Sequence, residues 1–375
     1  MSVVQNIADF RDEKGRVYTP TLLLFCLLLT ELKNCRRQRQ RVRWLNGNWL
    51  WIRNVWKDAT DEDAPKTSPS QATLSRLLNK VDLWALTNQY HAARRAKASQ
   101  RSENLQIERY RHYAFDGKSR QGCVSQTTGR TEIDVTLFDV ETREVIARRT
   151  LPDKKGEAPA ARDLLRRIGR KLSPGVITGD PGFTSPTLTS SIINAGHEYL
   201  IGLKGNAGEV FLLCQSFEWK NAAILAETQE RSHGRVEKRV LRRISLSRPR
   251  RKKFAKYSKC AYLFEIESHR TEGGKTTFEK RYFIGSGGLR GLKGENLLKL
   301  LREHWHQENG LHWVKDAVLG EDKLPKMSNR ASRVLGFFKE FVVTLGFTIF
   351  RSVQRFVDEF DARTEKFIRE LIKRE

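Results

Sequence analysis

Three acidic residues stand where carboxylates could do chemistry. Asp116 and Asp180 each follow a short apolar run, and a glycine comes within two residues of each, as Gly117 and Gly182. Strand ends carry ligands and chemistry in α/β sheets, and a glycine lets the backbone turn away so that the carboxylate faces open space. An Asp before a Gly is more often an ordinary turn residue, so neither aspartate is sufficient evidence alone. The third acid is Glu308, in a helical segment much further along the chain.

The segment around Glu308 places polar side chains on one face of a predicted helix. The residues His304, Glu308, His312 and Lys315 follow one another at spacings of four, four and three. That spacing aligns them on an α-helix. The stripe begins N-terminally with leucines at positions 297 and 301. A stripe that starts apolar and becomes polar is typical of a helix that packs into a core at one end and lines a site at the other.

Two alternatives for this segment stay open. Three histidines and one glutamate could form a zinc site, although His306 points away from the face that carries Glu308. The pair Asn309-Gly310 could end the helix, because it favours turns and an interior glycine costs roughly 1 kcal/mol relative to alanine. In that case Lys315 would lose its place on the Glu308 face.

Two aspartates and a glutamate form a donor set suited to divalent metal ions. Mg²⁺ prefers oxygen ligands and keeps several of its waters. Two such ions about 3.5 to 4 Å apart can activate a nucleophile and stabilise a leaving oxygen in phosphoryl transfer. A lysine seven residues after the glutamate would point a cation at the neighbouring phosphates. We therefore expect two Mg²⁺ ions per site, with Mn²⁺ as the alternative ion, held by Asp116, Asp180 and Glu308.

The composition points to a polyanionic partner. The chain has 375 residues, enough for two or three domains, and its 69 Lys and Arg exceed its 44 Asp and Glu to give a formal charge of +25. A hydrophobic content of 39% indicates a folded protein with a basic surface, not a disordered tail. The apolar run at residues 22–29 is too short to span a membrane. Five widely spaced cysteines without a C-x-x-C pair fit a reducing cytoplasm.

The elements that must position these residues follow a clear order. Residues up to about 97 have a helical pattern. Apolar runs near residues 113–115, 133–138, 145–147, 176–177 and 199–203 predict strands, and residues 158–168 and 187–195 predict helices between them. The resulting order is β-β-β-α-β-α-β. Residues 207–290 contain several strand-like runs, residues 297–318 and 334–356 are two long helical segments, and a charged tail follows.

Several segments resemble one known family. The string HWHQENGLHWVKDAVLGED, from His304 on, is similar to the signature of DDE transposases of insertion sequences of the ISAs type (H-repeat-associated-like). That branch belongs to the superfamily with a Tyr-Arg-Glu-Lys signature. FDGK at residues 115–118 and TGDPGF at 178–183 resemble its first two catalytic segments, and KGN at 204–206 resembles a following Lys-x-Asn run. Here the signature Arg and Tyr are replaced by His304 and Leu301, whereas the Lys is kept as Lys315.

The resemblance implies an α/β fold with an RNase H-like catalytic core. We expect residues 1–110 to form a helical N-terminal DNA-binding domain, 111–206 and 291–350 the core, 207–290 a β-rich insertion before the glutamate helix, and 351–375 a helical tail. The implied activity is metal-dependent cleavage at the ends of a mobile element and strand transfer into target DNA. We expect a prokaryotic protein of the cytoplasm that is associated with the nucleoid and has no membrane partner. It would act as a homodimer on double-stranded DNA, at the terminal inverted repeats of the element and at the target.

Basic and aromatic side chains are candidate DNA contacts. For the phosphates near the cut, the candidates are Lys118, Lys204, Arg302, His312 and Lys315. Weaker candidates elsewhere are Arg36, Arg37, Arg39, Arg41, Arg43, Arg250, Arg251 and Lys252, together with Trp219, which could stack on a base but is more often core in a β-rich unit. Two other functions stay open. One is a structure-selective nuclease or resolvase with the same core, and the other is a non-catalytic DNA-binding protein derived from a transposase.

Overall fold

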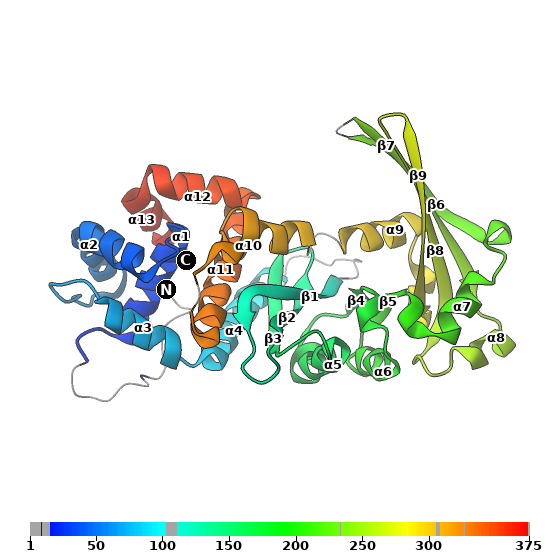
Figure 1. Cartoon of the computed structure of the whole chain (residues 1–375), viewed down its shortest axis with the longest axis horizontal. Coiled ribbons are helices and arrows are strands. Elements are labelled where there is room, and N and C mark those ends of the chain that lie inside the picture. Colours follow the sequence, from blue (N-terminus) through cyan, green and yellow to red (C-terminus); the bar gives the residue numbers. More distant parts are fainter. Residues whose placement is uncertain are drawn as a thin grey trace.

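The computed structural model describes residues 9, 16–102, 111–232, 234–304, 308–325 and 327–373, and their side chains except those of residues 93–102, 121, 122, 308 and 309. The molecule is elongated (Figure 1). A helical body lies at one end, a twisted sheet runs through the middle, and long antiparallel strands form the other end. No helix in the described part of the chain is both long and apolar enough to cross a bilayer.

One mixed sheet connects these parts. In the described residues its order is β3-β2-β1-β4-β5-β9-β8-β7-β6. The strands are β1 (Arg111–Val124), β2 (Thr131–Asp139), β3 (Glu144–Leu151), β4 (Gly175–Gly179), β5 (Glu198–Leu203), β6 (Ala223–Ser232), β7 (Arg235–Ser245), β8 (Cys260–Glu272) and β9 (Lys275–Ser286). Strands β1 to β3 form an antiparallel meander, and β4 and β5 continue it in parallel. The predicted order β-β-β-α-β-α-β is confirmed, with α5 (Glu157–Ile168) and α6 (Pro186–Asn194) as its helices.

The first strand is longer than its apolar run predicted. β1 pairs with the parallel strand β4 only as far as Phe115, which lies opposite Gly179, but it continues beside β2 to Val124. Asp116 therefore stands where the parallel pairing ends, in the middle of a strand. The expectation that the strand ends at Asp116 was wrong, because the antiparallel partner β2 still satisfies the backbone of the following residues.

The strands of the predicted insertion extend the same sheet. β9 pairs antiparallel with β5, and β8, β7 and β6 follow outward, so that four long strands continue the sheet beyond its central part. Two short helices, α7 (Glu209–Gln215) and α8 (Arg248–Lys253), belong to this region. The pairing of β5 with β9 joins these outer strands to the central strands.

The two faces of the central strands have different covers. Tyr113 and Phe115 of β1 pack into the core that contains the buried residues of α5 and α6. Ala114 packs into the opposite core, with residues of α11 (Asn329–Phe350). Because side chains alternate along a strand, Asp116 shares the α11 face with Ala114, and Gly117 shares the α5 face with Phe115.

The helical body is built from both ends of the chain. The helices α1 (Pro20–Leu32), α2 (Gln38–Thr60), α3 (Gln71–Lys80) and α4 (Leu83–Ser102) share one core with α11, α12 (Val353–Ala362) and α13 (Thr364–Lys373). Ion pairs Lys33–Asp361 (2.9 Å) and Arg369–Asp58 join the two chain ends. Ser70 caps α3 as expected, since its hydroxyl accepts a hydrogen bond from the Thr73 amide (3.2 Å).

The segment predicted as one helix over residues 297–318 is divided. Helix α9 spans Gly294–Glu303, a π-helix spans Glu308–His312, and α10 spans Trp313–Ala317. The described residues from Glu308 to Ala317 are helical on both sides of Gly310, so the alternative in which Asn309-Gly310 ends the helix was wrong. A π-turn widens the helix locally and is frequent at functional sites.

Candidate active site

The register of two parallel strands sets Asp116 beside Asp180. Phe115 lies opposite Gly179, Asp116 is the next residue of β1, and Asp180 directly follows the end of β4. Neighbouring strands are about 4.8 Å apart, so the two aspartates leave adjacent points of the sheet. Their carboxylates are held by local backbone amides: Gly117 donates to Oδ1 of Asp116 (2.7 Å), and Gly182 donates to Oδ1 of Asp180 (2.8 Å).

Burial disfavours the charged form of the Asp180 carboxyl. Burial raises the pKa of its carboxyl above the ordinary value, against the opposing effects of the Gly182 amide and of Lys154 and Lys204. Both lysine side chains belong to exposed residues. The site therefore combines a buried carboxylate with two exposed lysines whose charges favour its ionised form.

The two glycines that follow the aspartates differ in their surroundings. Gly117 continues β1, so its predicted turn was wrong, whereas Gly182 lies in the 3-10 turn Pro181–Phe183 that directly follows β4. Neither glycine has a positive φ, and both make room for a side chain. A β-carbon on Gly117 would overlap Oε1 of Glu157, and one on Gly182 would lie 3.0 Å from Oδ1 of Asp180 and 3.1 Å from Oε2 of Glu157.

Glu157 is thus a site residue that the sequence reasoning missed. It occupies the first turn of α5, where an acidic residue is common because it favours the helix N-terminus. That ordinary placement gives no functional signal. The signal was the pair of glycines, one after each aspartate, which the sequence reasoning assigned to turns.

In the helical segment that carries Glu308, His312 contacts the site. The backbone of Glu308 begins the π-helix, whereas its side chain lies outside the described side chains. Four residues later, Nδ1 of His312 lies 3.3 Å from Oδ2 of Asp116. Burial, then the charges of Lys315 and Lys118, lower the pKa of His312 to about 3. A neutral imidazole with its proton on Nδ1 can donate to Asp116 and orient that carboxylate.

The donor chemistry fits hard divalent ions, but the described side chains do not enclose one. Asp116 and Asp180 offer the oxygen ligands that Mg²⁺ prefers. Within the described residues, no three His, Cys, Asp or Glu side chains converge on a point as a metal cage would require. Glu308, the predicted third ligand, is outside that set. Asp116 and Asp180 would therefore supply two of the ligands.

His304 and His112 share one threonine and do not form a metal site. His304 Nδ1 and His112 Nε2 each lie 2.9 Å from Oγ1 of Thr178 on β4. Burial lowers the pKa of both imidazoles, that of His304 to about 3. This chain of hydrogen bonds anchors the end of α9 to the sheet.

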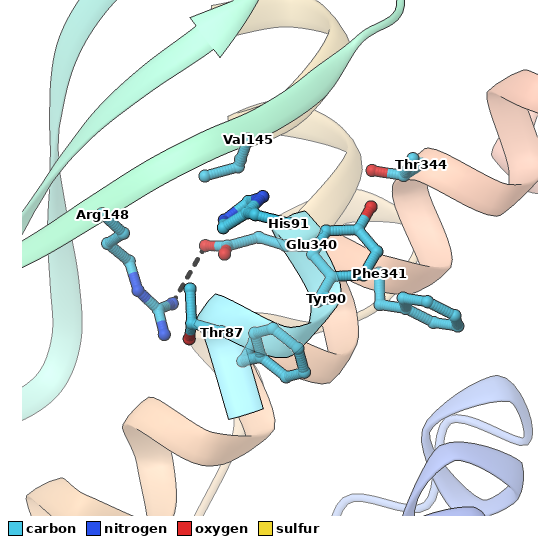
Figure 2. Close-up of a pocket in the computed structure, with 9 residues that line it drawn as sticks. Thr87, Tyr90, His91, Val145, Arg148, Glu340, Phe341 and Thr344 are labelled. Atoms are coloured by element: carbon cyan, nitrogen blue, oxygen red, sulfur yellow. Dashed lines mark hydrogen bonds and ion pairs between the residues drawn. The ribbon is translucent and has the colours of Figure 1, made fainter. Parts of the chain in front are cut away.

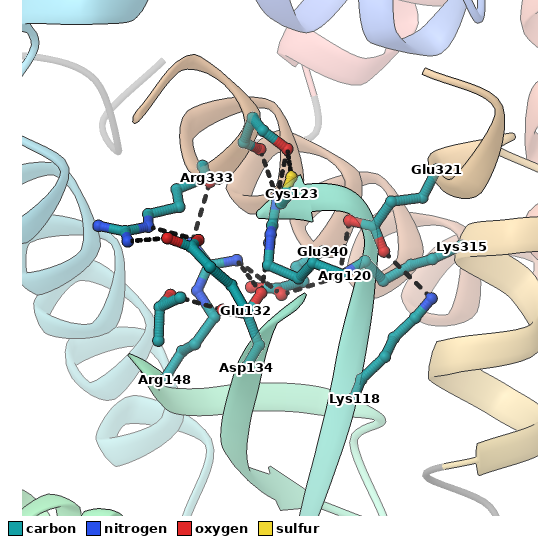
Figure 3. Close-up of polar contacts among 12 residues, drawn as sticks. Lys118, Arg120, Cys123, Glu132, Asp134, Arg148, Lys315, Glu321, Arg333 and Glu340 are labelled. Atoms are coloured by element: carbon teal, nitrogen blue, oxygen red, sulfur yellow. Dashed lines mark hydrogen bonds and ion pairs between the residues drawn. The ribbon is translucent and has the colours of Figure 1, made fainter. Parts of the chain in front are cut away.

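Lys315 is not available to a phosphate in this structure. The residue is 2% exposed, and its Nζ lies 3.1 Å from both Glu321 and Glu340 (Figure 3). Burial alone would lower its pKa, but these two carboxylates raise it above the ordinary value. The predicted phosphate contact is corrected to an internal ion pair, because the face of α10 that carries Lys315 packs against α11.

Lys118 also points into this cluster. Its Nζ lies 2.5 Å from Asp316 and 3.4 Å from Glu321, and its side chain is 10% exposed. The assignment of Lys118 to DNA phosphates is corrected in the same way. A strand residue of β1 thereby holds the segment that carries His312, since Asp316 lies in α10.

The cluster continues across the sheet to α11. Arg120 pairs with Asp134, and Arg148 lies 3.0 Å from Glu340 and 3.6 Å from Asp134. Burial raises the pKa of Glu321, but Lys315, Arg120 and Lys118 outweigh it and bring the value to about 2. The paired charges lock α10 and α11 to the strand that bears Asp116 (Figure 3).

Of the other predicted phosphate contacts, His312 is 8% exposed and faces Asp116, so its assignment to a phosphate is corrected, whereas Lys204 and Arg302 are at the surface. Lys204 is exposed directly after β5, and the neighbouring Asn206 donates from Nδ2 to the carbonyl of Pro181 (2.6 Å). Arg302 of α9 is half-exposed and pairs with Glu230 of β6 (2.6 Å). Lys204 lies close enough to Asp180 to influence its pKa, whereas Arg302 is held toward the outer strands.

The arginines near the N-terminus that were weaker candidates for DNA contacts differ in their exposure to solvent. Arg37, Arg39 and Arg43 are exposed, and Arg36 is half-buried near Gly320. Arg41 is 1% exposed and pairs with Glu31, whose other oxygen lies 2.9 Å from Lys339. Its assignment to DNA is therefore corrected to an internal ion pair between α1, α2 and α11.

Trp219 is a core residue. It is 4% exposed, and its indole nitrogen donates to the carbonyl of Cys214 (2.8 Å). Stacking on a base would require it to leave this place, so the DNA-binding assignment is corrected. Arg250, Arg251 and Lys252 are exposed on α8, and the Arg250 guanidinium lies 5.0 Å above the Phe217 ring.

A small pocket lies between α4, β3 and α11. Thr87, Tyr90, Val145 and Glu340 are among its lining residues, with the Arg148–Glu340 ion pair at its edge (Figure 2). None of the predicted site residues lines it. It therefore belongs to the contact between the helical body and the sheet.

Comparisons with known proteins find relatives named as transposases. A protein named "Putative transposase YncI" from Escherichia coli O157:H7 is 26% identical over 248 residues, 62% of this chain and 60% of that protein. The "H repeat-associated putative transposase YhhI" of Escherichia coli K12 is 26% identical over 251 residues, 62% of this chain and 63% of that protein. The chain thus spans less than two thirds of the length of these relatives.

One solved structure and one family model complete the comparison. The cryo-EM structure of a piggyBac transposase synaptic complex with hairpin DNA aligns with a TM-score of 0.42 and 9% identity, over 99% of this chain and 75% of that one. That similarity is too low to carry an argument. The family model described as "Transposase DDE domain" matches residues 107–339, more than half of the chain. The chain belongs to the family of transposase DDE domains.

Proposed function

We propose that this protein is a DDE transposase that cleaves DNA at the ends of an insertion sequence and joins them to target DNA, with Asp116, Asp180 and Glu308 as metal ligands. The supporting observation is the strand register that sets Asp116 beside Asp180, inside the region matched by the family model. The proposed core is RNase H-like. The ISAs-type branch is proposed from the signature residues.

The chain's own residues have distinct tasks in this reaction. Two Mg²⁺ or Mn²⁺ ions, when bound, would supply activation of the attacking hydroxyl and stabilisation of the leaving oxygen. Asp116 and Asp180 hold their carboxylates at adjacent strand positions, and Glu308 adds the third. His312 orients Asp116 through its Nδ1 proton. The cluster around Lys315 and Glu321 keeps α10 in place, because its charges are paired with β1 and α11.

The exposed cations would meet the DNA. Lys204, beside Asp180, is placed to contact a phosphate near the cut, and Lys154 lies close to the same carboxylate. The excess of 25 positive charges supports a long-range attraction to double-stranded DNA, as the terminal repeats and the target would require. A homodimer pairing two DNA ends in a prokaryotic cytoplasm, associated with the nucleoid, completes the proposal.

The test is a cleavage and joining assay on the DNA that flanks the coding sequence in its genome. With Mg²⁺, the wild-type chain should nick this DNA and transfer the 3′-hydroxyl end to a target plasmid. Asp180→Asn should bind the DNA but leave it uncut. Cutting without joining would favour a structure-selective nuclease, and binding without cutting by the wild type would favour a non-catalytic DNA-binding protein.

A further inference from the structure

We propose that Glu157 is a further ligand for a divalent ion held by Asp180, an inference that rests on the proposed function. The family signature contains the two aspartates and Glu308, and Glu157 comes from a different element, the first turn of α5. The geometry around three residues, Gly117, Gly182 and Asp180, leads to it.

The backbone at both aspartates leaves space for this one carboxylate. Gly117 follows Asp116, and any side chain there would collide with Oε1 of Glu157. Gly182 follows Asp180 by two residues, and a side chain there would crowd both Oε2 of Glu157 and Oδ1 of Asp180. Because neither glycine has a positive φ, the backbone conformation itself does not demand glycine. Access for the Glu157 carboxylate is what the absence of both side chains provides.

No basic side chain in the described part of the chain lies within ion-pair distance of the Glu157 carboxylate, although the charge of the exposed Lys154 acts on it and lowers its pKa. Among the described residues, no hydrogen bond or ion pair to this carboxylate is found, although it is half-buried next to Asp180. Three buried carboxylates elsewhere in the molecule do form ion pairs. Each has a basic side chain within ion-pair distance, as seen for Asp134, Glu321 and Glu340. Burial, then the charge of Asp180, raise the pKa of Glu157. A divalent cation between the two carboxylates would offset both the repulsion and the lost hydration.

The backbone of Glu157 is held by helix α5, whereas its side chain has rotatable bonds. Ala160, Ala161, Leu164 and Leu165 are buried against the sheet, so the helix is held in place. The glutamate side chain can rotate about three bonds. In the present arrangement its carboxylate lies over Gly117 and does not close a cage with both aspartates, in agreement with the absence of a three-residue cluster in the described part of the chain.

Metal binding to the full chain without DNA tests this role. Mn²⁺ affinity is measured by isothermal titration calorimetry for wild type, Asp180→Asn and Glu157→Gln. The matched control is Glu295→Gln, which removes an exposed glutamate from the first turn of α9. We expect Glu157→Gln to bind Mn²⁺ at least about tenfold more weakly than wild type, since even indirect partners of a metal commonly contribute 10- to 100-fold. Glu295→Gln should bind as wild type does.

A second readout separates a metal ligand from a structural residue. Without metal, Glu157→Gln should melt at the same temperature as wild type or higher, because one of two facing negative charges is gone. Its melting temperature should then rise less with Mn²⁺. If Glu157→Gln does not fold, Glu157→Asp withdraws the carboxylate by one methylene and serves the same comparison, with the same weakening expected.

The outcomes distinguish this inference from the function on which it rests. Unchanged Mn²⁺ affinity in Glu157→Gln, together with a loss in Asp180→Asn, would overturn the role of Glu157 and leave the aspartate site standing. Unchanged affinity in both variants, or no Mn²⁺ binding by the wild type, would overturn the proposed metal site itself and Glu157 with it. Loss in both variants, with Glu295→Gln intact, supports the inference.

Discussion

Replacing Lys315 by methionine separates a buried ion pair from a phosphate contact. Its Nζ lies 3.1 Å from Glu321 and 3.1 Å from Glu340, and the residue is 2% exposed. Removing one partner of a buried ion pair costs about 3 to 5 kcal/mol, because the remaining charges stay buried without compensation. Lys118 and Arg148 still contact these carboxylates, so we expect the lower end, about 3 kcal/mol. Methionine fills most of the volume and leaves little cavity.

The assay is urea unfolding followed by circular dichroism, with DNA binding measured in parallel. Lys204→Met is the matched control, since the same substitution at an exposed lysine should change the unfolding free energy by less than about 0.5 kcal/mol. The reasoning would be refuted if Lys315→Met unfolded like wild type while its DNA affinity fell and the salt dependence of binding became shallower by about one counterion. That pattern is the mark of a lost phosphate contact.

Two further predictions follow from burial. Trp219→Ala should lower the unfolding free energy by about 3 to 5 kcal/mol in urea and leave the DNA affinity of the folded fraction unchanged; a stable variant with weakened DNA binding would restore the base-stacking role. The folded-state pKa values of His112 and His304 lie below the unfolded value of about 6.5, so the unfolded chain takes up protons first and stability falls as pH drops from about 6.5 toward 3. In urea titrations at several pH values, His304→Gln should remove about 1.4 kcal/mol per pH unit from that slope, and an unchanged slope would contradict the assignment.

The sequence predicted the strands and the neighbouring positions of the two aspartates. The alternation of apolar residues predicted the strands. Apolar runs before Asp116 and Asp180 predicted that the two acids lie side by side, as the β1–β4 register has it, although Asp116 lies within β1 and not at its end. The hydroxyl of Ser70 was identified as a cap because that role depends on residues within one turn.

The sequence did not predict which helix faces are buried by other elements. The spacing placed Lys315 on a polar stripe, but its burial depends on Glu340, twenty-five residues further on. Arg41 was grouped with four other arginines by proximity, although it falls four residues before the buried Leu45 and eight before the buried Trp49. That helical spacing was a usable signal for burial. The spacing of Glu157 in the sequence gave none, since its neighbours at Gly117 and Gly182 come from other elements.

The most direct test of the central claim is a crystal structure of the full chain grown with Mn²⁺, in which anomalous scattering locates the ion. We predict Mn²⁺ at coordination distance, about 2.1 Å, from the carboxylates of Asp116 and Asp180, with the carboxylate of Glu308 completing the site. A crystal with no Mn²⁺ between the two aspartates, or with the Glu308 carboxylate turned into the interior away from both, would contradict it.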